Sequence, residues 1–208
     1  MPDFTLEPEH ALIVGMTGSG KTTFVNTYLL NAPGVACRFI FDDLNRVWPR
    51  LRLKPCYTAR ELEQSVPTRW SVFNPARAFP GNLKGAFRWW CKWIFDVSHR
   101  GPGRKLVCIP ELWRFCNDDS IPVELAMLSQ AGRELGVELV LDTQRPELVN
   151  ASITGAATEL VCFKLLSPEA LTAVKKLGAD RDQVAALPLG TFVSLNRLSG
   201  GTLSGRVF

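Results

Sequence analysis

Short apolar runs alternate with longer amphipathic segments along most of the chain. The runs that predict buried strands lie at 11–14, 35–41, 69–73, 106–109, 137–141 and 160–165. Each run is nearly continuous, as expected for a strand that is covered on both faces. Helices are predicted between them, at 21–30, 82–97, 121–135 and 168–177. This alternation predicts an α/β fold in which a mostly parallel sheet is flanked by helices.

Residues 82–97 give the clearest amphipathic pattern. The apolar face consists of Leu83, Ala86, Phe87, Trp90, Ile94 and Val97, and it is widened by Trp89 and Trp93. We interpret this tryptophan group as a packing face laid on the sheet rather than a stacking platform for nucleic acid. Arg88 and Lys92, on the opposite side, are expected to be solvated.

The remaining pattern bears on domain organisation. Alternating segments at 190–196 and 202–208 flank Ser199-Gly-Gly and predict a C-terminal β-hairpin. The least regular stretch, 47–67, is the expected place for an insertion or a mobile loop. Because no repeat or linker stands out, residues 1–208 are expected to form a single domain.

Composition narrows the setting. The net charge of +4 permits an acidic partner such as a nucleic acid without requiring one. No apolar run approaches the roughly 20 residues that span a bilayer, and no secretory signal is evident, so the chain is expected to work in an aqueous compartment. The six cysteines and two histidines lack ligand spacing, which predicts reduced structural thiols and no zinc site.

Residues 15–22, Gly-Met-Thr-Gly-Ser-Gly-Lys-Thr, match the phosphate-loop (Walker A) pattern G-x-x-x-x-G-K-[ST], with a strand before and a helix after. The glycines let consecutive N–H groups cradle phosphates at the helix N-terminus. Lys21 is expected to reach the β- and γ-phosphates, and the Thr22 hydroxyl to ligate Mg²⁺. The residues expected to bind the nucleotide are Gly15, Thr17, Gly18, Ser19, Gly20, Lys21, Thr22 and Thr23. No guanine-reading Asn-Lys-x-Asp motif is present, so ATP is favoured over GTP.

Hydrolysis also needs a carboxylate near the magnesium ion and the attacking water. Glu111 follows the run 106–109 and Pro110, at the end of a strand expected beside the loop strand, and is the candidate to polarise water. Alternatively, it caps a helix expected at 112–116. Pro110 occupies the position where the usual motif has aspartate. Magnesium would then need another carboxylate, for which Asp42 and Asp43 are the candidates.

Two further features complete the candidate site. Gln144 follows the run 137–141, where a polar side chain would sense the γ-phosphate. The alternative is a simple turn set up by Asp142, Thr143 and Pro146. An arginine from a neighbouring subunit often acts on the transition state of such enzymes. The candidates for that role are Arg133, Arg145, Arg181 and Arg197.

Together, the loop motif, the strand ending at Glu111 and residues 131–146 (AGRELGVELVLDTQRP) resemble the FtsK/HerA branch of P-loop ATPases. Within that branch, a chain of this size is similar to the genome-packaging ATPases of membrane-containing, tailless icosahedral viruses. The resemblance implies a RecA/ASCE-like P-loop NTPase sheet. It also implies a ring-forming motor that uses ATP and Mg²⁺ to move double-stranded DNA into a preformed capsid.

The resemblance carries roles over to individual positions. Lys21 and Thr22 match phosphate and Mg²⁺ binding, Glu111 matches water activation, and Gln144 matches γ-phosphate sensing. Arg133 and Arg145 match basic positions that flank the sensor strand, one of which would act in trans. The implied partners are double-stranded DNA, further copies of the chain, and a capsid or membrane-vertex protein. The implied locations are the host cytoplasm and the packaging vertex of the virion.

Two other functions remain open from the sequence. One is a phosphotransferase acting on a small molecule, with residues 101–105 as a lid. The other is a nucleotide-gated assembly module, as in filamentous-phage morphogenesis or secretion, in which Pro110 marks a site that binds ATP and barely cleaves it.

Overall fold

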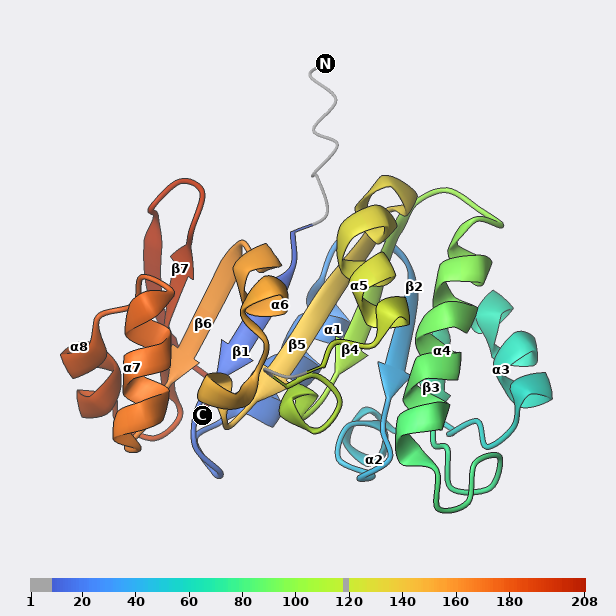
Figure 1. Ribbon diagram of the computed structural model, residues 1–208, viewed down its shortest axis with the longest axis horizontal. Helices are drawn as coiled ribbons and strands as arrows, with labels where there is room; N and C mark the ends of the chain where they lie inside the picture. Colours follow the sequence, from blue (N-terminus) through green and yellow to red (C-terminus); the bar gives the residue numbers. More distant parts are fainter. Residues whose placement is uncertain (1–8, 118–119) are drawn as a thin grey trace.

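One eight-stranded sheet runs through the computed structural model, which describes residues 9–117 and 120–208. The strands are β1 (Ala11–Val14), β2 (Val35–Phe41), β3 (Trp70–Phe73), β4 (Arg104–Ile109), β5 (Val137–Thr143), β6 (Glu159–Phe163), β7 (Thr191–Asn196) and β8 (Thr202–Arg206). Their order is β3-β2-β4-β5-β1-β6-β7-β8 (Figure 1). Strands β1 to β6 are parallel, and β7 and β8 add an antiparallel hairpin. The predicted α/β sheet with a C-terminal hairpin is therefore confirmed.

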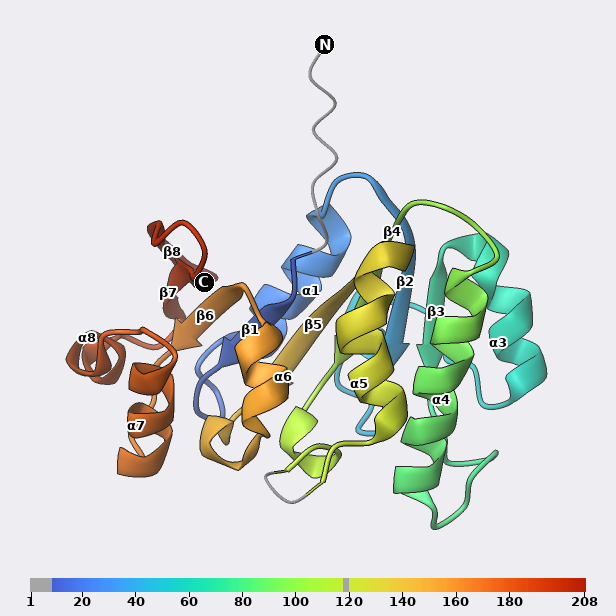
Figure 2. The same cartoon turned by 45° about the horizontal axis from the view of Figure 1, so that its top comes forward.

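Helices cover both faces of this sheet. They are α1 (Lys21–Asn31), α2 (Trp48–Leu51), α3 (Ala59–Ser65), α4 (Leu83–Ser98), α5 (Val123–Gln130), α6 (Ala151–Ala156), α7 (Pro168–Lys176) and α8 (Arg181–Ala186). Short 3₁₀ turns lie at Val66–Thr68, Leu112–Arg114, Ala131–Leu135 and Pro146–Leu148. Helices α4 to α7 pack on one face and α1 on the other (Figure 2). Among the described residues, no helix combines the length and apolarity needed to cross a bilayer.

Helix α4 packs on the sheet as its pattern predicts. Trp90 is fully buried and Trp93 is 8% exposed, with the Trp93 ring edge-on to Phe39 of β2 at 5.6 Å between centroids. The Asn82 side chain accepts a hydrogen bond from the Gly85 N–H and so fixes the helix start. The tryptophans thus belong to the core, which removes the nucleic-acid stacking alternative for this face.

The stretch 47–67 differs from its expected irregular form. It contains α2 and α3, and α3 begins with a capping box in which Thr58 and Glu61 exchange side-chain and backbone hydrogen bonds. Helix α2 is only four residues long and α3 is mostly polar, so hydrophobic periodicity does not reveal either of them. The helix predicted at 121–135 is shorter than expected: α5 runs from Val123 to Gln130, and a 3₁₀ turn continues to Leu135.

His10 joins β1 to the layer above it. The imidazole is 1% exposed, its Nε2 lies 2.8 Å from the Ser129 carbonyl oxygen, and its Nδ1 accepts the Leu139 N–H at 3.1 Å. Accepting at Nδ1 and donating at Nε2 requires the neutral ring. Burial, opposed by the Ser129 bond and aided by Arg133, lowers the pKa of His10 to about 4.

Acid should therefore destabilise the fold through His10. The pKa is lower in the folded than in the unfolded chain, so the stability it contributes is present above the unfolded value of 6.5. That stability is lost as the pH falls through about 4. We expect a loss of about 3 kcal/mol from this group, measured as the unfolding free energy between pH 7 and pH 4.

The matched variants are His10→Gln and His99→Gln, because His99 is exposed. His10→Gln should flatten the pH dependence, whereas His99→Gln should leave it as in the wild type. An identical pH slope in wild type and His10→Gln would contradict this role for His10.

Candidate nucleotide site

The glycine-rich loop joins the carboxyl end of β1 to the start of α1. Gly20 precedes α1 with φ of 115° and has no side chain to cap the helix, so the first N–H groups of α1 stay available to an anion. The loop lies close to β6: a Cβ at Gly15 would meet the Phe163 Cβ at 2.6 Å, and the Met16 N–H donates to the Lys164 carbonyl at 2.8 Å. This is the backbone arrangement that the loop motif predicts.

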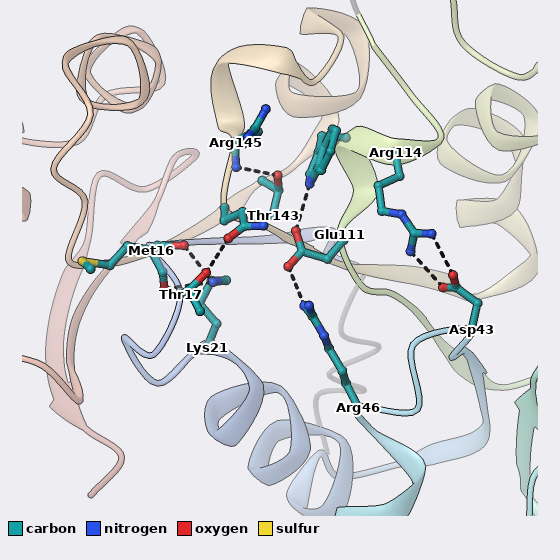
Figure 3. A network of polar contacts seen from close by, with 12 residues as sticks. Met16, Thr17, Lys21, Asp43, Arg46, Glu111, Arg114, Thr143 and Arg145 are labelled. Atoms are coloured by element: carbon teal, nitrogen blue, oxygen red, sulfur yellow. Dashed lines mark hydrogen bonds and ion pairs between the residues drawn. The ribbon is translucent and has the colours of Figure 1, made fainter.

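A cavity of about 460 Å³ opens in front of this loop. It is lined by Thr17, Gly18, Gly20, Lys21, Thr22, Thr23, Arg46, Arg50, Glu111, Asp142 and Phe208. The Lys21 Nζ donates to the carbonyl oxygens of Gly15 at 2.7 Å and Met16 at 3.2 Å, which holds the ammonium over the loop (Figure 3). Cationic side chains and the backbone of the loop therefore line the cavity where phosphates would bind.

Glu111 reaches this cavity from the end of β4. Its backbone is left-handed, with φ of 52°, which is uncommon for a residue with a side chain and typical of functional positions. The carboxylate, 5% exposed, accepts from Arg46 Nη1 at 2.7 Å and Trp113 Nε1 at 2.9 Å (Figure 3). The expected helix at 112–116 is only a 3₁₀ turn, and the carboxylate bonds these two partners rather than the N–H groups of that turn. This geometry disfavours the capping alternative.

The strand order differs from expectation at one point. β5 lies between β4 and the loop strand β1, so the strand that carries Glu111 is not the neighbour of the loop strand. Gln144, which follows β5, is the closer of the two: its Oε1 accepts the Thr17 hydroxyl at 2.6 Å. The structure thus brings Lys21, Glu111 and Gln144 to one edge of the sheet. The Arg145 N–H also donates to Thr143 Oγ1 at 3.0 Å, so the turn alternative describes the same segment correctly.

The second strand does not supply the missing carboxylate. Asp42 accepts the backbone N–H groups of Arg46, Val47 and Trp48 at 2.8, 2.9 and 2.9 Å. Asp43 pairs with Arg114 at 2.8 Å. Both carboxylates are thus committed to holding the chain after β2, which corrects the expectation that Asp42 or Asp43 would face the magnesium.

Asp142 takes the position that those residues do not fill. The register pairs Ile109 with Leu141, so the next positions, Pro110 and Asp142, lie side by side. Residues alternate along β5, and Val140 packs on the α1 face, so Asp142 points to that face as well. Its Oδ1 is buried and has no hydrogen-bond partner among the described residues.

The charge state of Asp142 reflects its burial. Burial raises the pKa of Asp142 to about 6; Lys21 and Arg46 oppose this rise, and the Glu111 charge adds to it. The sequence reasoning assigned Asp142 to a turn, although it carries the same signal as Glu111: an acidic residue at the end of a buried run. Arg46 and Trp113, which hold Glu111, show no comparable signal in the sequence.

The predicted arginines are scattered. Arg133 lies before β5, at the opposite edge of the sheet from the loop, and donates to the Ala156 carbonyl at 3.1 Å. Arg197 donates to the carbonyls of Thr154 and Ala157 at 2.9 and 2.6 Å, so both of these side chains stabilise the end of α6. Arg145 lies at the loop edge, exposed, with its guanidinium 4.9 Å from the Trp113 ring centroid. Arg181 is exposed on α8.

The chemistry of the donor set fits a magnesium ion bound together with a nucleotide. The cavity offers the Thr22 hydroxyl and the unpartnered Asp142 oxygen. In the part of the chain that the structure describes, no three His, Cys, Asp or Glu side chains gather as a metal centre. Two protein oxygens suffice for Mg²⁺, since it retains waters and takes further ligands from substrate phosphates.

Comparison with known proteins supports the same fold. No family model matches the chain. Protein P9 of Pseudoalteromonas phage PM2 is 28% identical over 170 residues, which cover 81% of the chain and 74% of that protein. The genome packaging NTPase B204 from Sulfolobus turreted icosahedral virus 2, in complex with the ATP analogue AMPPCP, has a TM-score of 0.74 at 16% identity and covers 96% of the chain and 98% of B204.

A more distant likeness extends to a larger protein. EssC (ATPases 2 and 3) from Geobacillus thermodenitrificans has a TM-score of 0.60 at 15% identity, covering 94% of the chain and 39% of that protein. The fold expected from the sequence motifs is therefore confirmed: the chain has the same fold as B204.

Proposed function

We propose that the chain is an ATP-hydrolysing motor that moves double-stranded DNA into a preformed viral capsid, with residues 1–208 acting as one ATPase domain. The observation that carries the proposal is the convergence of Lys21, Glu111 and Asp142 on one cavity beside the phosphate loop. The resemblance of the chain in fold to the genome packaging NTPase B204 supports the choice of DNA as the cargo, and its similarity in sequence to a protein of phage PM2 supports a viral setting.

The loop side of the cavity binds and orients the triphosphate. Backbone N–H groups at the start of α1 and the Lys21 ammonium neutralise the β- and γ-phosphates. Thr22 and Asp142 would hold magnesium, which supplies positive charge to the developing phosphate oxyanions when it is bound. Gln144 reports the γ-phosphate to the loop through its hydrogen bond with Thr17.

Glu111 performs the proton transfer. The oxygen of a water molecule attacks the γ-phosphorus, and the bond to the β–γ bridging oxygen breaks. The Glu111 carboxylate takes a proton from that water, and ADP departs with the bridging oxygen. A carboxylate has about four lone-pair sites, so Glu111 can accept from water while it keeps its bonds to Arg46 and Trp113.

Assembly into a homo-oligomeric ring would complete the site. Arg145 is exposed at the loop edge, which suits an arginine that acts on the nucleotide of an adjacent subunit, whereas the Arg133 side chain is engaged at the opposite edge. Sequential hydrolysis around the ring would move surface segments along the DNA backbone. The motor would work in the host cytoplasm, docked to a capsid or membrane-vertex protein at the packaging vertex.

The test is ATP turnover as a function of protein concentration, with and without double-stranded DNA at low salt. Backbone contacts are strongest at low ionic strength, so DNA should raise turnover most there. Turnover per subunit should rise with concentration if a neighbour completes the site, and Lys21→Ala should abolish it. An ATP turnover rate that is the same with and without double-stranded DNA at low salt would contradict the proposed motor function. Tight ATP binding without turnover under every condition would favour the nucleotide-gated assembly module.

A further inference from the structure

The cavity in front of the phosphate loop has two chemically different ends. One end, beneath β4 and β5, carries Glu111 and Asp142. The other end carries Gly20 and Phe208, beside the C-terminal hairpin: Gly20 lies against Val207, and the Phe208 ring lies against Gly190. Because Glu111 activates the water that attacks the γ-phosphorus, the γ-phosphate must lie at the Glu111 end, and a triphosphate in the loop directs its nucleoside away from β4 and β5, toward the hairpin.

Residues that flank the C-terminal hairpin contact the phosphate loop. The Gly190 N–H donates to the Ser19 carbonyl at 3.0 Å, and the Val207 N–H donates to the Gly190 carbonyl at 2.8 Å. A Cβ at Gly20 would lie 2.8 Å from Val207 Cγ2. These contacts fix the last residues of the chain against the loop that binds the phosphates.

The ring of Phe208 lies against Gly190. A Cβ at Gly190 would meet Phe208 Cε2 at 2.6 Å, so only glycine lets the ring approach this closely. Phe208 is nevertheless 60% exposed, and it is the aromatic residue among the described residues that line the cavity. A held aromatic ring with open surface at the nucleoside end of a phosphate site is suited to stack against a planar base.

We propose that Phe208 is the platform on which the nucleobase stacks, so that the C-terminal hairpin supplies the base subsite of this ATPase. The proposal rests on the proposed nucleotide site. Stacking reads the face of a base and not its hydrogen-bonding edge. The platform therefore strengthens binding of nucleoside triphosphates as a class, and GTP depends on it as ATP does.

The test compares ligands with and without a base. The dissociation constants of MgATP, MgGTP and magnesium tripolyphosphate are measured by calorimetry for the wild type, Phe208→Ala and Phe208→Trp. Loss of one stacking contact should weaken ATP and GTP by about 5- to 150-fold in Phe208→Ala. Tripolyphosphate binding should not change, and Phe208→Trp should restore the affinity for both nucleotides. Leu203→Ala is the matched control, because Leu203 is 66% exposed on β8 and is not among the described residues that line this cavity. This variant should bind all three ligands as the wild type does.

The outcomes distinguish failure of the Phe208 platform from failure of the nucleotide site itself. Equal weakening of ATP and tripolyphosphate in Phe208→Ala, or no weakening of ATP, overturns the platform but does not contradict the proposed phosphate site, which the wild type would still show by binding both ligands. A wild-type chain that binds neither ATP nor tripolyphosphate contradicts the proposed nucleotide site as well. A Phe208→Trp variant that binds ATP as weakly as Phe208→Ala also overturns the platform.

Discussion

Glu111→Gln should lower the rate of ATP hydrolysis by about 10²- to 10⁴-fold, the contribution of a positioned general base. Glutamine has the same shape and can still accept from Trp113 Nε1, but it cannot take a proton from the attacking water. The Arg46 partner would lose its ion pair, and the Arg46 side chain is 48% exposed, so water can solvate it. The measurement is steady-state turnover at saturating ATP together with equilibrium ATP binding.

ATP binding should survive this substitution, because Glu111 acts on the water and not on the phosphates. Glu124→Gln is the matched control, since Glu124 of α5 pairs with Arg88 of α4 and is not among the described residues that line the cavity. That control should hydrolyse ATP at the wild-type rate. Glu111→Gln turnover close to that of the wild type would exclude Glu111 as the general base.

Asp142→Asn should stabilise the nucleotide-free protein and impair the enzyme at the same time. In the wild type the folded pKa, about 6, is raised above the unfolded value of 3.8, so the neutral acid is favoured by folding. The stability that this provides is fully present below 3.8 and is lost as the pH rises through 6. Above pH 6 the buried charge costs about 3 kcal/mol, a cost that the uncharged asparagine avoids.

The expected measurement is urea unfolding at pH 4 and pH 8. The variant should match the wild type at pH 4 and exceed it by about 3 kcal/mol at pH 8. Turnover should fall by about 10- to 100-fold, the usual effect of losing a group that supports a metal ion. A variant that is no more stable at pH 8, or that retains full turnover, would contradict the role assigned to Asp142.

The sequence predicted much of the sheet because buried parallel strands are continuous apolar runs, and the glycine motif marks where β1 ends. It did not predict the strand order, because the position of β5 between β4 and β1 depends on crossovers that no local pattern records. Helix α3 was missed for a different reason. Its start is determined by the Thr58–Glu61 capping box and only Leu62 of its residues is buried, so periodicity carries little signal.

In the candidate site, too, local motifs were predictable from the sequence, whereas features that depend on tertiary packing were not. Lys21, Glu111 and Gln144 could be located because each follows directly on a strand or belongs to a local motif. Asp142 carries the same signal as Glu111, but whether its side chain enters the cavity depends on β5 extending to Thr143 and on β4 lying alongside, which the sequence does not show. The position of Asp42 at a strand end predicted a metal ligand, but its carboxylate instead accepts hydrogen bonds from three backbone N–H groups of the segment that follows.

ATP-driven displacement of a third DNA strand tests most directly whether the chain couples ATP hydrolysis to movement along DNA. A triplex-forming oligonucleotide is bound to duplex DNA ahead of the motor, and its release is followed with ATP, with a non-hydrolysable analogue, and with Lys21→Ala. A chain that hydrolyses ATP in this cavity and couples hydrolysis to movement along DNA should release the third strand only with ATP and an intact Lys21. A third strand that stays bound while the wild type consumes ATP would contradict the account.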